Sequence, residues 1–387
     1  MDMSFSAEEE LFREEVRTWL GEHLVGDFAR LRGRGGLGDM DAFVEERIAW
    51  EQELGRGGWT GLAWSKESGG RGASLVEQVI FLEEYARSRA PGRAGHIGEG
   101  LLGPTVAAFG TDAQKARFLA PILAGTEIWC QGYSEPNAGS DLAALQTRAV
   151  RDGDNWVIDG QKVWTSLAMV SQWCFVLART GAGSSRHEGI SCLLVRMDQP
   201  GVRVVPIRQM TGNAEFAEVF FDGATTPVDH VVGPVDGGWK VAMHTLAHER
   251  GASTLGQQAD FTNELRALVQ VAKDNGAAND PGIRDRLAEL WMRLKVMRLT
   301  ALRTLSAHDR GELPREAMIT KLFWATWHRD LGELAMDVLG PDAAVLREGH
   351  DHDLHRLFLW TRSDTIYAGT NEIQKNLIAQ RALGMPR

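Results

Sequence analysis

The segment Gln131–Asp141 reads Gln-Gly-Tyr-Ser-Glu-Pro-Asn-Ala-Gly-Ser-Asp, and the fold can be worked out from it. Its glycines and its proline favour a bent backbone that can come close to a ligand, and Ser134 and Ser140 supply hydroxyl groups. Farther along the chain, Lys162–Ser166 (Lys-Val-Trp-Thr-Ser) places an aromatic ring beside two more hydroxyls at the end of an expected strand. This combination suits a flat ring system rich in heteroatoms better than a phosphate or a metal. The alternative interpretation is an ordinary loop followed by an ordinary strand.

The composition is that of a globular protein. The chain has 387 residues, which suggests two or three domains, and 43% of them are hydrophobic. Its net charge of −10 argues against a nucleic-acid partner, and no apolar run approaches the length of a membrane span. Acidic Glu8–Glu10 stand where a secretory signal would carry positive charge, so we expect a cytoplasmic protein. Cys130, Cys174 and Cys192 lack metal-ligand spacing and are expected to be buried free thiols.

The pattern of apolar residues changes twice along the chain and predicts an α+β protein. Residues 1–125 are expected to be mostly helical, beginning with a capping box at Ser6–Glu9. Residues 126–237 are rich in Val, Trp, Phe and Ile between turn residues, which predicts a compact antiparallel barrel or sandwich. Residues 238–387 carry long amphipathic segments, which predict a helical bundle. The expected strands are Trp156–Ile158, Trp173–Ala178, Ile190–Val195, Val202–Ile207 and Glu218–Phe221, and the expected bundle helices are Trp239–Asp274, Gly282–Arg310, Pro314–Leu339 and Glu372–Arg381.

Four motifs in a fixed order carry a resemblance to a known family. They lie at Phe109–Leu119, Ser134–Asp141, Asn155–Ser166 and Tyr367–Gln374. With these motifs the chain resembles the acyl-CoA dehydrogenase family over essentially its full length. The resemblance implies an N-terminal helical domain, a central antiparallel β-barrel and a C-terminal four-helix bundle. It also implies FAD as the cofactor, an acyl-CoA thioester oxidised to its 2,3-enoyl product, and electron-transfer flavoprotein as the electron acceptor.

The resemblance further implies where the flavin lies. The loop at Gln131–Ser140 would lie along the cofactor, Trp164 would cover one face of its ring, and Ser166 would bond near the nitrogen that accepts hydride. The implied cofactor residues are Gln131, Tyr133, Ser134, Gly139, Ser140, Trp164, Thr165, Ser166, Thr370, Asn371 and Glu372, and the implied substrate contacts are Ser140 and Gly369.

The catalytic base is not where most of the family has it. Removing a proton α to a thioester requires a carboxylate in a dry pocket, where desolvation raises its pKa. Many members carry that glutamate between the Tyr and the Gly of the last motif, but this chain has Ala368 there. A minority keeps it on the first bundle helix before an arginine, a pattern that His248-Glu249-Arg250 matches. The resemblance therefore implies Glu249 as the base, Arg250 as the residue that tunes its charge, and the Ala368 backbone N–H as a donor to the thioester carbonyl. The alternative for Glu249 is an exposed helix carboxylate paired with a neighbouring cation.

Two motifs that reach a neighbouring subunit's flavin in familiar members are altered in this chain. Arg-x-x-Phe-Gly is replaced by Lys273–Pro281, which contains neither Arg nor Phe, and a Gln that precedes Gly-Gly is replaced by Asp337, whose charge would repel a pyrophosphate. The chain could form a homotetramer, or a heterotetramer whose other subunit lends the missing arginine. Two other functions stay open: a non-catalytic structural subunit of a heteromeric acyl-CoA dehydrogenase, and a flavin oxidase or monooxygenase on the same fold.

Other patterns are expected to carry no chemistry. Gly33–Gly38 satisfies G-x-G-x-x-G, but no strand precedes it, so we expect a loop. Glu348–His355 is rich in His and Asp without a known ligand spacing, so solvated charge is expected there and no metal site. Four tryptophans at helical spacing are expected in the bundle core and a subunit interface: Trp291, Trp324, Trp327 and Trp360.

Overall fold

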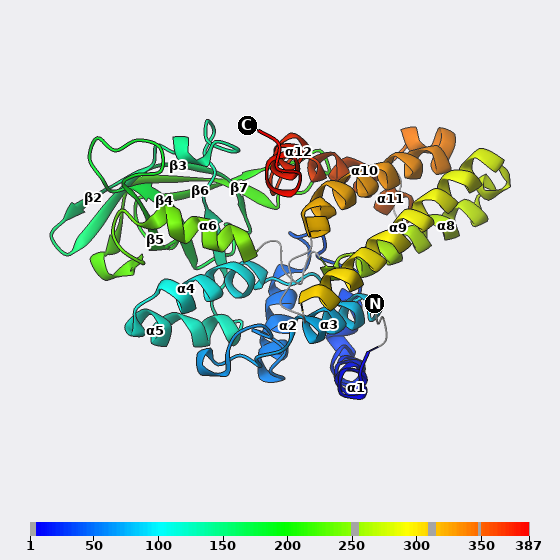
Figure 1. The fold of residues 1–387 in the computed structure, drawn as a ribbon, viewed down its shortest axis with the longest axis horizontal. Coiled ribbons are helices and arrows are strands. Elements are labelled where there is room, and N and C mark those ends of the chain that lie inside the picture. The colour runs from blue at the N-terminus through cyan, green and yellow to red at the C-terminus, as the bar shows by residue number, and fades with distance from the viewer. Residues whose placement is uncertain (1–4, 249–254, 309–314, 347–349, 387) are drawn as a thin grey trace. The chain divides into compact units, whose positions relative to one another are not determined.

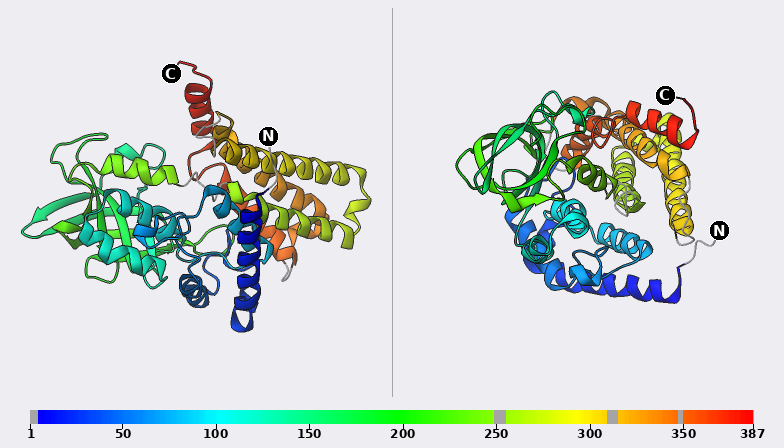
Figure 2. Two further views of the ribbon diagram at one scale, coloured as in Figure 1. Left: turned by 60° about the horizontal axis from the view of Figure 1, so that its bottom comes forward. Right: turned by 60° about the vertical axis from the view of Figure 1, so that its left-hand side comes forward.

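A computed structural model describes residues 5–248, 255–308, 315–346 and 350–386 of the chain. Its contacts divide the chain into two compact units, and each is described by itself (Figures 1 and 2). The bundle unit comprises Met1–Glu22, Ser74–Ala90 and Gly251–Arg387, and the sheet unit comprises His23–Ala73 and Pro91–Arg250. The domain boundaries at residues 125 and 237 stay predictions, because this division follows contacts and not the order of the chain.

The sheet unit is built on eight strands. Their order is β6-β7-β3-β2-β4-β5-β8, and β1 pairs with β4 outside this path. Neighbours run antiparallel except for the parallel pair β1–β4 and a single parallel pairing of Arg148 in β2 with Arg179 in β4. The predicted antiparallel β domain is therefore confirmed, with these exceptions. The strands are β1 (Trp129–Gly132), β2 (Arg148–Asp152), β3 (Asn155–Ser166), β4 (Trp173–Arg179), β5 (Ile190–Arg196), β6 (Val202–Ile207), β7 (Phe216–Pro227) and β8 (Val231–Val232).

Both faces of strands β4 and β5 are covered, which explains their unbroken apolar sequences. On one face, alternate residues of these strands pack with the helices α4 (Gly103–Phe109), α5 (Asp112–Leu123) and α6 (Gly238–His248). On the other face they pack with residues of β3 and β7. The helix α2 (Val44–Arg56) also belongs to this unit. The three cysteines are buried and free, as predicted.

The bundle unit contains long helices that pack side by side (Figures 1 and 2). A buried cluster between α8, α9 and α10 includes Trp324 and Trp327. Trp291 is 55% exposed and does not belong to this cluster, so its place at a subunit interface stays a prediction. The predicted segment Pro314–Leu339 becomes helical at Thr320, after a 3-10 turn at Arg315–Ile319. The helices are α1 (Ala7–His23), α3 (Leu75–Arg87), α8 (Gln258–Asp274), α9 (Pro281–His308), α10 (Thr320–Leu339), α11 (His350–Asp364) and α12 (Asn371–Leu377).

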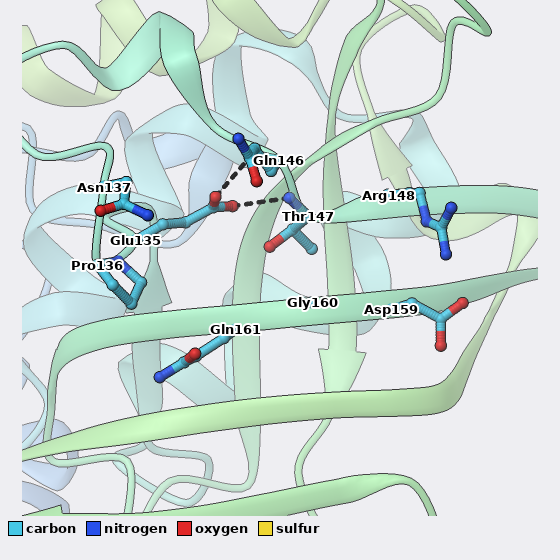
Figure 3. A pocket seen from close by; sticks show the side chains of 9 residues that line it. All are labelled: Glu135, Pro136, Asn137, Gln146, Thr147, Arg148, Asp159, Gly160 and Gln161. Carbon is cyan, nitrogen blue, oxygen red and sulfur yellow. Dashed lines mark hydrogen bonds between the residues drawn. The ribbon is translucent and has the colours of Figure 1, made fainter.

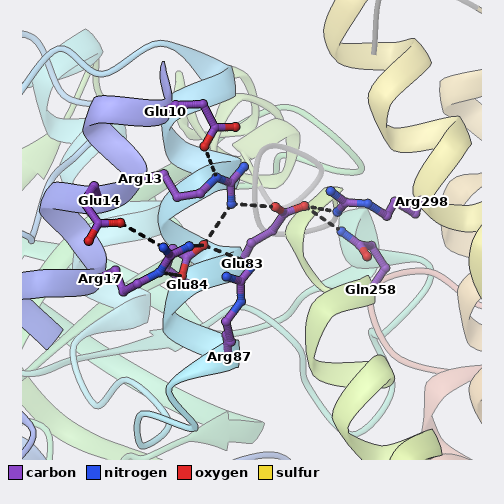
Figure 4. A network of polar contacts seen from close by, with 9 residues as sticks. All are labelled: Glu10, Arg13, Glu14, Arg17, Glu83, Glu84, Arg87, Gln258 and Arg298. Atoms are coloured by element: carbon purple, nitrogen blue, oxygen red, sulfur yellow. Dashed lines mark hydrogen bonds and ion pairs between the residues drawn. The ribbon is translucent and has the colours of Figure 1, made fainter. Parts of the chain in front are cut away.

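A buried ionic network joins α1 and α3 to α8 and α9 (Figure 4). Arg13 on α1 donates from Nη1 to Glu83 Oε2 at 3.2 Å and to Glu84 Oε1 at 2.9 Å, both on α3. Glu83 also pairs with Arg298 on α9 and accepts a hydrogen bond from Gln258 Nε2 on α8 at 3.3 Å. These contacts place two N-terminal helices in the same unit as the C-terminal bundle. Within the described residues, every helix is too short or too polar to cross a bilayer.

Candidate active site

The loop that follows β1 is held in a tight turn. Glu135 and Ala138 exchange backbone hydrogen bonds of 3.1 and 3.0 Å, with Pro136 and Asn137 at the tip. The Val163 N–H donates to the Ser134 carbonyl at 3.0 Å, which ties the loop to β3. The segments Gln131–Asp141 and Lys162–Ser166, which the sequence analysis selected, are therefore neighbours in the structure although they lie apart in the chain.

The Glu135 carboxylate holds this loop from inside, a role that no sequence pattern predicted. It accepts hydrogen bonds from the backbone N–H groups of Gln146 at 2.6 Å and Thr147 at 2.9 Å (Figure 3), and from Lys162 Nζ at 2.7 Å. Lys162 has no exposed surface and also donates to the Tyr133 carbonyl at 3.2 Å. Burial alone would raise the pKa of Glu135, but the charge of Lys162 and the hydrogen bonds lower it below its ordinary value.

A cleft of about 380 Å³ lies outside this loop, beside β2 and β3 (Figure 3). This volume is at the lower end of the range for small-molecule sites. Its polar lining includes Arg148, Asp159 and Gln161. None of the residues predicted to bind the cofactor lines it, so the cleft does not mark the predicted flavin site.

The end of β3 presents an aromatic ring to the outside. A bulge interrupts the pairing of β3 with β7 between Lys162 and Thr165, and Trp164 takes a left-handed conformation with φ of +59°. This geometry leaves Trp164 58% exposed, while Thr165 has no exposed surface. A left-handed tryptophan is uncommon, and such backbone conformations concentrate at binding sites.

The donor set around the two segments fits a flat, heteroatom-rich cofactor. Gln131 Nε2 and Thr165 Oγ1 are buried and have no hydrogen-bond partner among the described residues. Buried polar atoms normally have a partner, so these two atoms can accommodate one from a ligand. Tyr133, by contrast, is 5% exposed and packs edge-on against Phe175 at 5.5 Å between ring centroids.

The last predicted motif forms a turn in the bundle unit, between α11 and α12. Ala368 is left-handed with φ of +51°, and Gly369 follows with φ of +88°. Gln374 Nε2 donates to the carbonyls of both residues, at 3.3 and 3.4 Å. No described residue accepts a hydrogen bond from the Ala368 N–H, and Ala368 itself is exposed. This N–H is thus available to a ligand.

The polar residues after this turn have structural partners. Thr370 caps α12, since its Oγ1 accepts a hydrogen bond from the Ile373 N–H at 3.2 Å. Asn371 is 9% exposed and donates from Nδ2 to Thr326 Oγ1 at 3.5 Å, and its Oδ1 has no partner in the described part of the chain. Glu372 is exposed.

The predicted base Glu249 and its neighbour Arg250 lie outside the described residues. The helix α6 reaches His248, and its Thr245 hydroxyl lies 2.9 Å from that of Thr105 in a buried pair. His244 on the same helix packs edge-on against Phe109. Among the described residues, His, Cys, Asp and Glu side chains form no group of three that could hold a metal ion.

Comparison with known proteins gives matches over almost the whole chain. Residues 6–126, 130–224 and 236–383 match the models for the N-terminal, middle and C-terminal domains of acyl-CoA dehydrogenase. Acyl-CoA dehydrogenase IpdE1 of Mycobacterium tuberculosis is 56% identical over 98% of each chain. Among solved structures, the Tcur3481-Tcur3483 steroid ACAD is 33% identical with a TM-score of 0.87, and it covers 100% of both chains. The ChsE4-ChsE5 complex of M. tuberculosis is 31% identical with a TM-score of 0.85, again over 100% of both chains.

Proposed function

This chain belongs to the acyl-CoA dehydrogenase family of oxidoreductases, and from that premise we propose that it oxidises a bulky, steroid-type acyl-CoA to the 2,3-enoyl-CoA. The relative at 33% identity is a steroid ACAD, which supports this substrate class. The alanine at 368 also leaves room where most family members carry a glutamate side chain.

The family uses FAD, and the residues present fit it. When bound, FAD supplies the acceptor for the hydride that leaves the β carbon. In our proposal Trp164 covers one face of the ring and excludes water, while Gln131 and Thr165 donate hydrogen bonds to its polar edge. The two buried polar atoms without partners support this assignment. Ser134, Ser166 and the Thr370–Glu372 segment complete the proposed set.

The observation that carries the mechanism is the geometry at Ala368. Its side chain cannot accept a proton, but its N–H has no acceptor within the described residues and lies in an exposed, left-handed turn. We assign this N–H to the thioester carbonyl oxygen, where it stabilises the negative charge that develops as the α proton leaves. Glu249 then takes that proton, with Arg250 beside it to tune its charge.

A panel of thioesters tests the substrate class. The FAD-loaded enzyme, with its partner subunit present, should turn over polycyclic acyl-CoAs with a kcat/KM at least about tenfold above that for straight-chain acyl-CoAs of equal carbon number, since each misplaced group costs roughly 1–3 kcal/mol. Product mass should show the loss of two hydrogens. A preference for straight-chain substrates would remove the steroid-type assignment but leave the dehydrogenase assignment in place.

We further propose a heterotetramer as the working assembly. The relatives at 33% and 31% identity are described as a pair, Tcur3481-Tcur3483, and as the ChsE4-ChsE5 complex. The altered segment Lys273–Pro281 supports a site completed by another subunit. Asp337 is less of an obstacle to a pyrophosphate than its charge suggests, because it pairs with Arg286.

A non-catalytic subunit is the second candidate, and Ala368 favours it. In that case the partner would carry all the chemistry, and the full complex with Glu249→Gln would keep its turnover. Electron-transfer flavoprotein is the proposed acceptor in the first candidate. Peroxide release under air without an added electron carrier would instead favour an oxidase.

A further inference from the structure

Two buried cations on α10 hold the residue from which the Ala368 turn begins. Lys321 and His328 lie two turns apart on the same face of the helix, and both bind Asp364, the last residue of α11. Lys321 Nζ donates to the Asp364 backbone carbonyl, and His328 Nδ1 lies 2.7 Å from Asp364 Oδ2. All three residues are buried, with exposures of 8%, 1% and 0%. We call this group the Asp364 clamp.

The clamp is charged. His328 Nε2 lies 2.7 Å from Glu264 Oε2 on α8, so the imidazole stands between two carboxylates. Burial alone would lower the pKa of His328, but Glu264 and Asp364 raise it to about 10, and both ring nitrogens therefore donate. Burying such charges is weak evidence for stability, because apolar residues of similar volume often stabilise a core at least as well. Apolar residues could pack α10 against α11 equally well, so the buried charges suggest a role besides stability.

Hydrogen bonds to Ser363, the residue before Asp364, and a cation–π contact from Lys321 connect the clamp to the turn. The Ser363 carbonyl accepts from the N–H groups of Ile366 at 2.8 Å and Tyr367 at 3.1 Å, so the chain leaves Asp364 in a fixed direction. The Lys321 ammonium also lies over the Tyr367 ring, 5.1 Å from its centroid. Tyr367 directly precedes the left-handed Ala368. An alanine stays in this conformation only where its surroundings hold it there.

We propose that Lys321, His328 and Asp364 are positioning residues for thioester oxidation, which hold the Tyr367–Gly369 turn so that the Ala368 N–H meets the thioester carbonyl oxygen. This inference rests on the proposed function. The N–H acts only where it is aimed at the oxygen as charge develops, and a displacement of about 1 Å can cost on the order of 100-fold in rate. The competing explanation is that the clamp only stabilises the bundle.

Two variants and one control separate these explanations in the full FAD-loaded complex. Lys321→Met removes the donor and the charge but keeps the aliphatic stem, and Asp364→Asn keeps the shape of the carboxylate without its charge. Asp330→Asn is the control: it weakens the ion pair between Arg293 Nη1 and Asp330 Oδ2, 2.8 Å apart, which joins α9 to α10 and includes no residue of α11 or of the turn. Melting temperature and FAD content are measured for all of them.

Two readouts report positioning. The first is the kcat for the acyl-CoA that the wild type oxidises fastest. The second is the ionised fraction of bound 4-nitrophenylacetyl-CoA, whose α-deprotonated form is coloured and which reports oxyanion stabilisation without turnover. We expect Lys321→Met and Asp364→Asn to lower kcat by about 10- to 100-fold and the ionised fraction in parallel, with KM within about threefold. Asp330→Asn should lower the melting temperature and leave both readouts unchanged.

Each outcome has one meaning. If both clamp variants match the wild type in kcat and in ionisation, or if the control falls with them, the positioning role is wrong. If Asp364→Asn does not fold, Lys321→Met decides alone, and if the probe does not bind the wild type, the kcat series decides. A wild-type complex that oxidises no acyl-CoA and ionises no analogue would refute the proposed function itself. A wild type and clamp variants that are equally active would refute only the positioning role.

Discussion

At residue 368 the chain has a backbone N–H without a described acceptor, which we propose binds the thioester, and it has no carboxylate side chain. The left-handed turn and the available N–H fit the binding of an oxyanion, while the carboxylate is proposed at Glu249. The other decisive residues are structural. Glu135 lies in the motif that predicted the cofactor site, but its carboxylate accepts hydrogen bonds from Lys162 and from two backbone N–H groups of the protein. Those bonds give the loop one conformation before any ligand arrives.

Lys162→Met should therefore lower the stability of the protein more than the same substitution of an exposed lysine does. Removing one partner of a buried ion pair leaves the other charge uncompensated, and we expect the free energy of unfolding to fall by about 3–5 kcal/mol. FAD content should fall as well, because the loop loses its anchor. Urea unfolding and flavin absorbance measure the two effects, with the exposed Lys66→Met as the control. A Lys162→Met protein as stable as the control would mean that Glu135 finds other partners.

The residue scale also shows what the sequence could not predict. Ser134, Trp164 and Ala368 stood out because they occupy recognisable motifs. The Glu135–Lys162 pair and the Asp364 clamp did not, because a lone charged residue is usually exposed and a sequence does not reveal which distant charge neutralises it. The neighbours of Lys162 give no clear signal of its burial, since the polar Gln161 precedes it and the apolar Val163 follows it.

At the scale of elements, the chain was predictable where its patterns are periodic and long. The strands β4, β5 and β6 lie where runs of Val, Ile and Leu predicted them, and α1 begins at Ala7, directly after the first residue of the predicted capping box at Ser6–Glu9. The parallel pairing of β1 with β4 was not predictable, because β2 and β3 intervene in sequence. The attachment of α3 to the bundle helices was also not predictable, because it depends on ion pairs between residues far apart in sequence, such as Glu83 and Arg298.

The helices α10 and α11 should give the bundle a distinctive dependence on pH. The raised pKa of His328, about 10 against an ordinary 6.5, means that its contribution to stability is fully present below pH 6.5 and is lost as pH rises toward 10. Lys321 acts in the opposite direction above pH 8, since burial lowers its pKa from 10.5 to about 8. Glu264 and Asp364 are the carboxylates that face His328, each 2.7 Å from one of its ring nitrogens. Stability should therefore fall by about 1 kcal/mol per pH unit between pH 6.5 and 8 and then level off.

Urea unfolding at a series of pH values measures this slope. His328→Gln should be less stable than the wild type at pH 6.5 and should show a shallower slope, because residue 328 no longer takes up a proton on folding. A slope that is equal in wild type and variant would show that the pH dependence comes from other groups.

At the scale of the whole molecule, the chain is an acyl-CoA dehydrogenase, and we propose that it relies on a second kind of subunit. The family is shown by matches along the entire chain, while the assembly is inferred from paired relatives and from the altered segment Lys273–Pro281. The sequence predicted the three-part fold because each part has its own periodicity. It could not predict the assembly, because the missing groups would come from another chain.

Flavin content tests this dependence on a partner. Purified by itself, the chain should hold well under one FAD per subunit. Co-expression with a second acyl-CoA dehydrogenase subunit from the same genome should raise the content severalfold, since the partner's cations add to the binding free energy. Mass and flavin absorbance of the purified complex give the ratio. A chain that binds one FAD per subunit by itself, as a homotetramer, would contradict the heteromeric assembly.

The central claim is that Glu249 removes the α proton of a bound thioester, and anaerobic mixing of the FAD-loaded complex with its fastest acyl-CoA tests it most directly. The loss of flavin absorbance then reports a single turnover. Glu249→Gln should slow this step by at least about 100-fold, the lower end of what a positioned base contributes, while flavin content and melting temperature stay within the range of the exposed control Glu333→Gln. A Glu249→Gln complex that reduces its flavin as fast as the wild type would contradict the account.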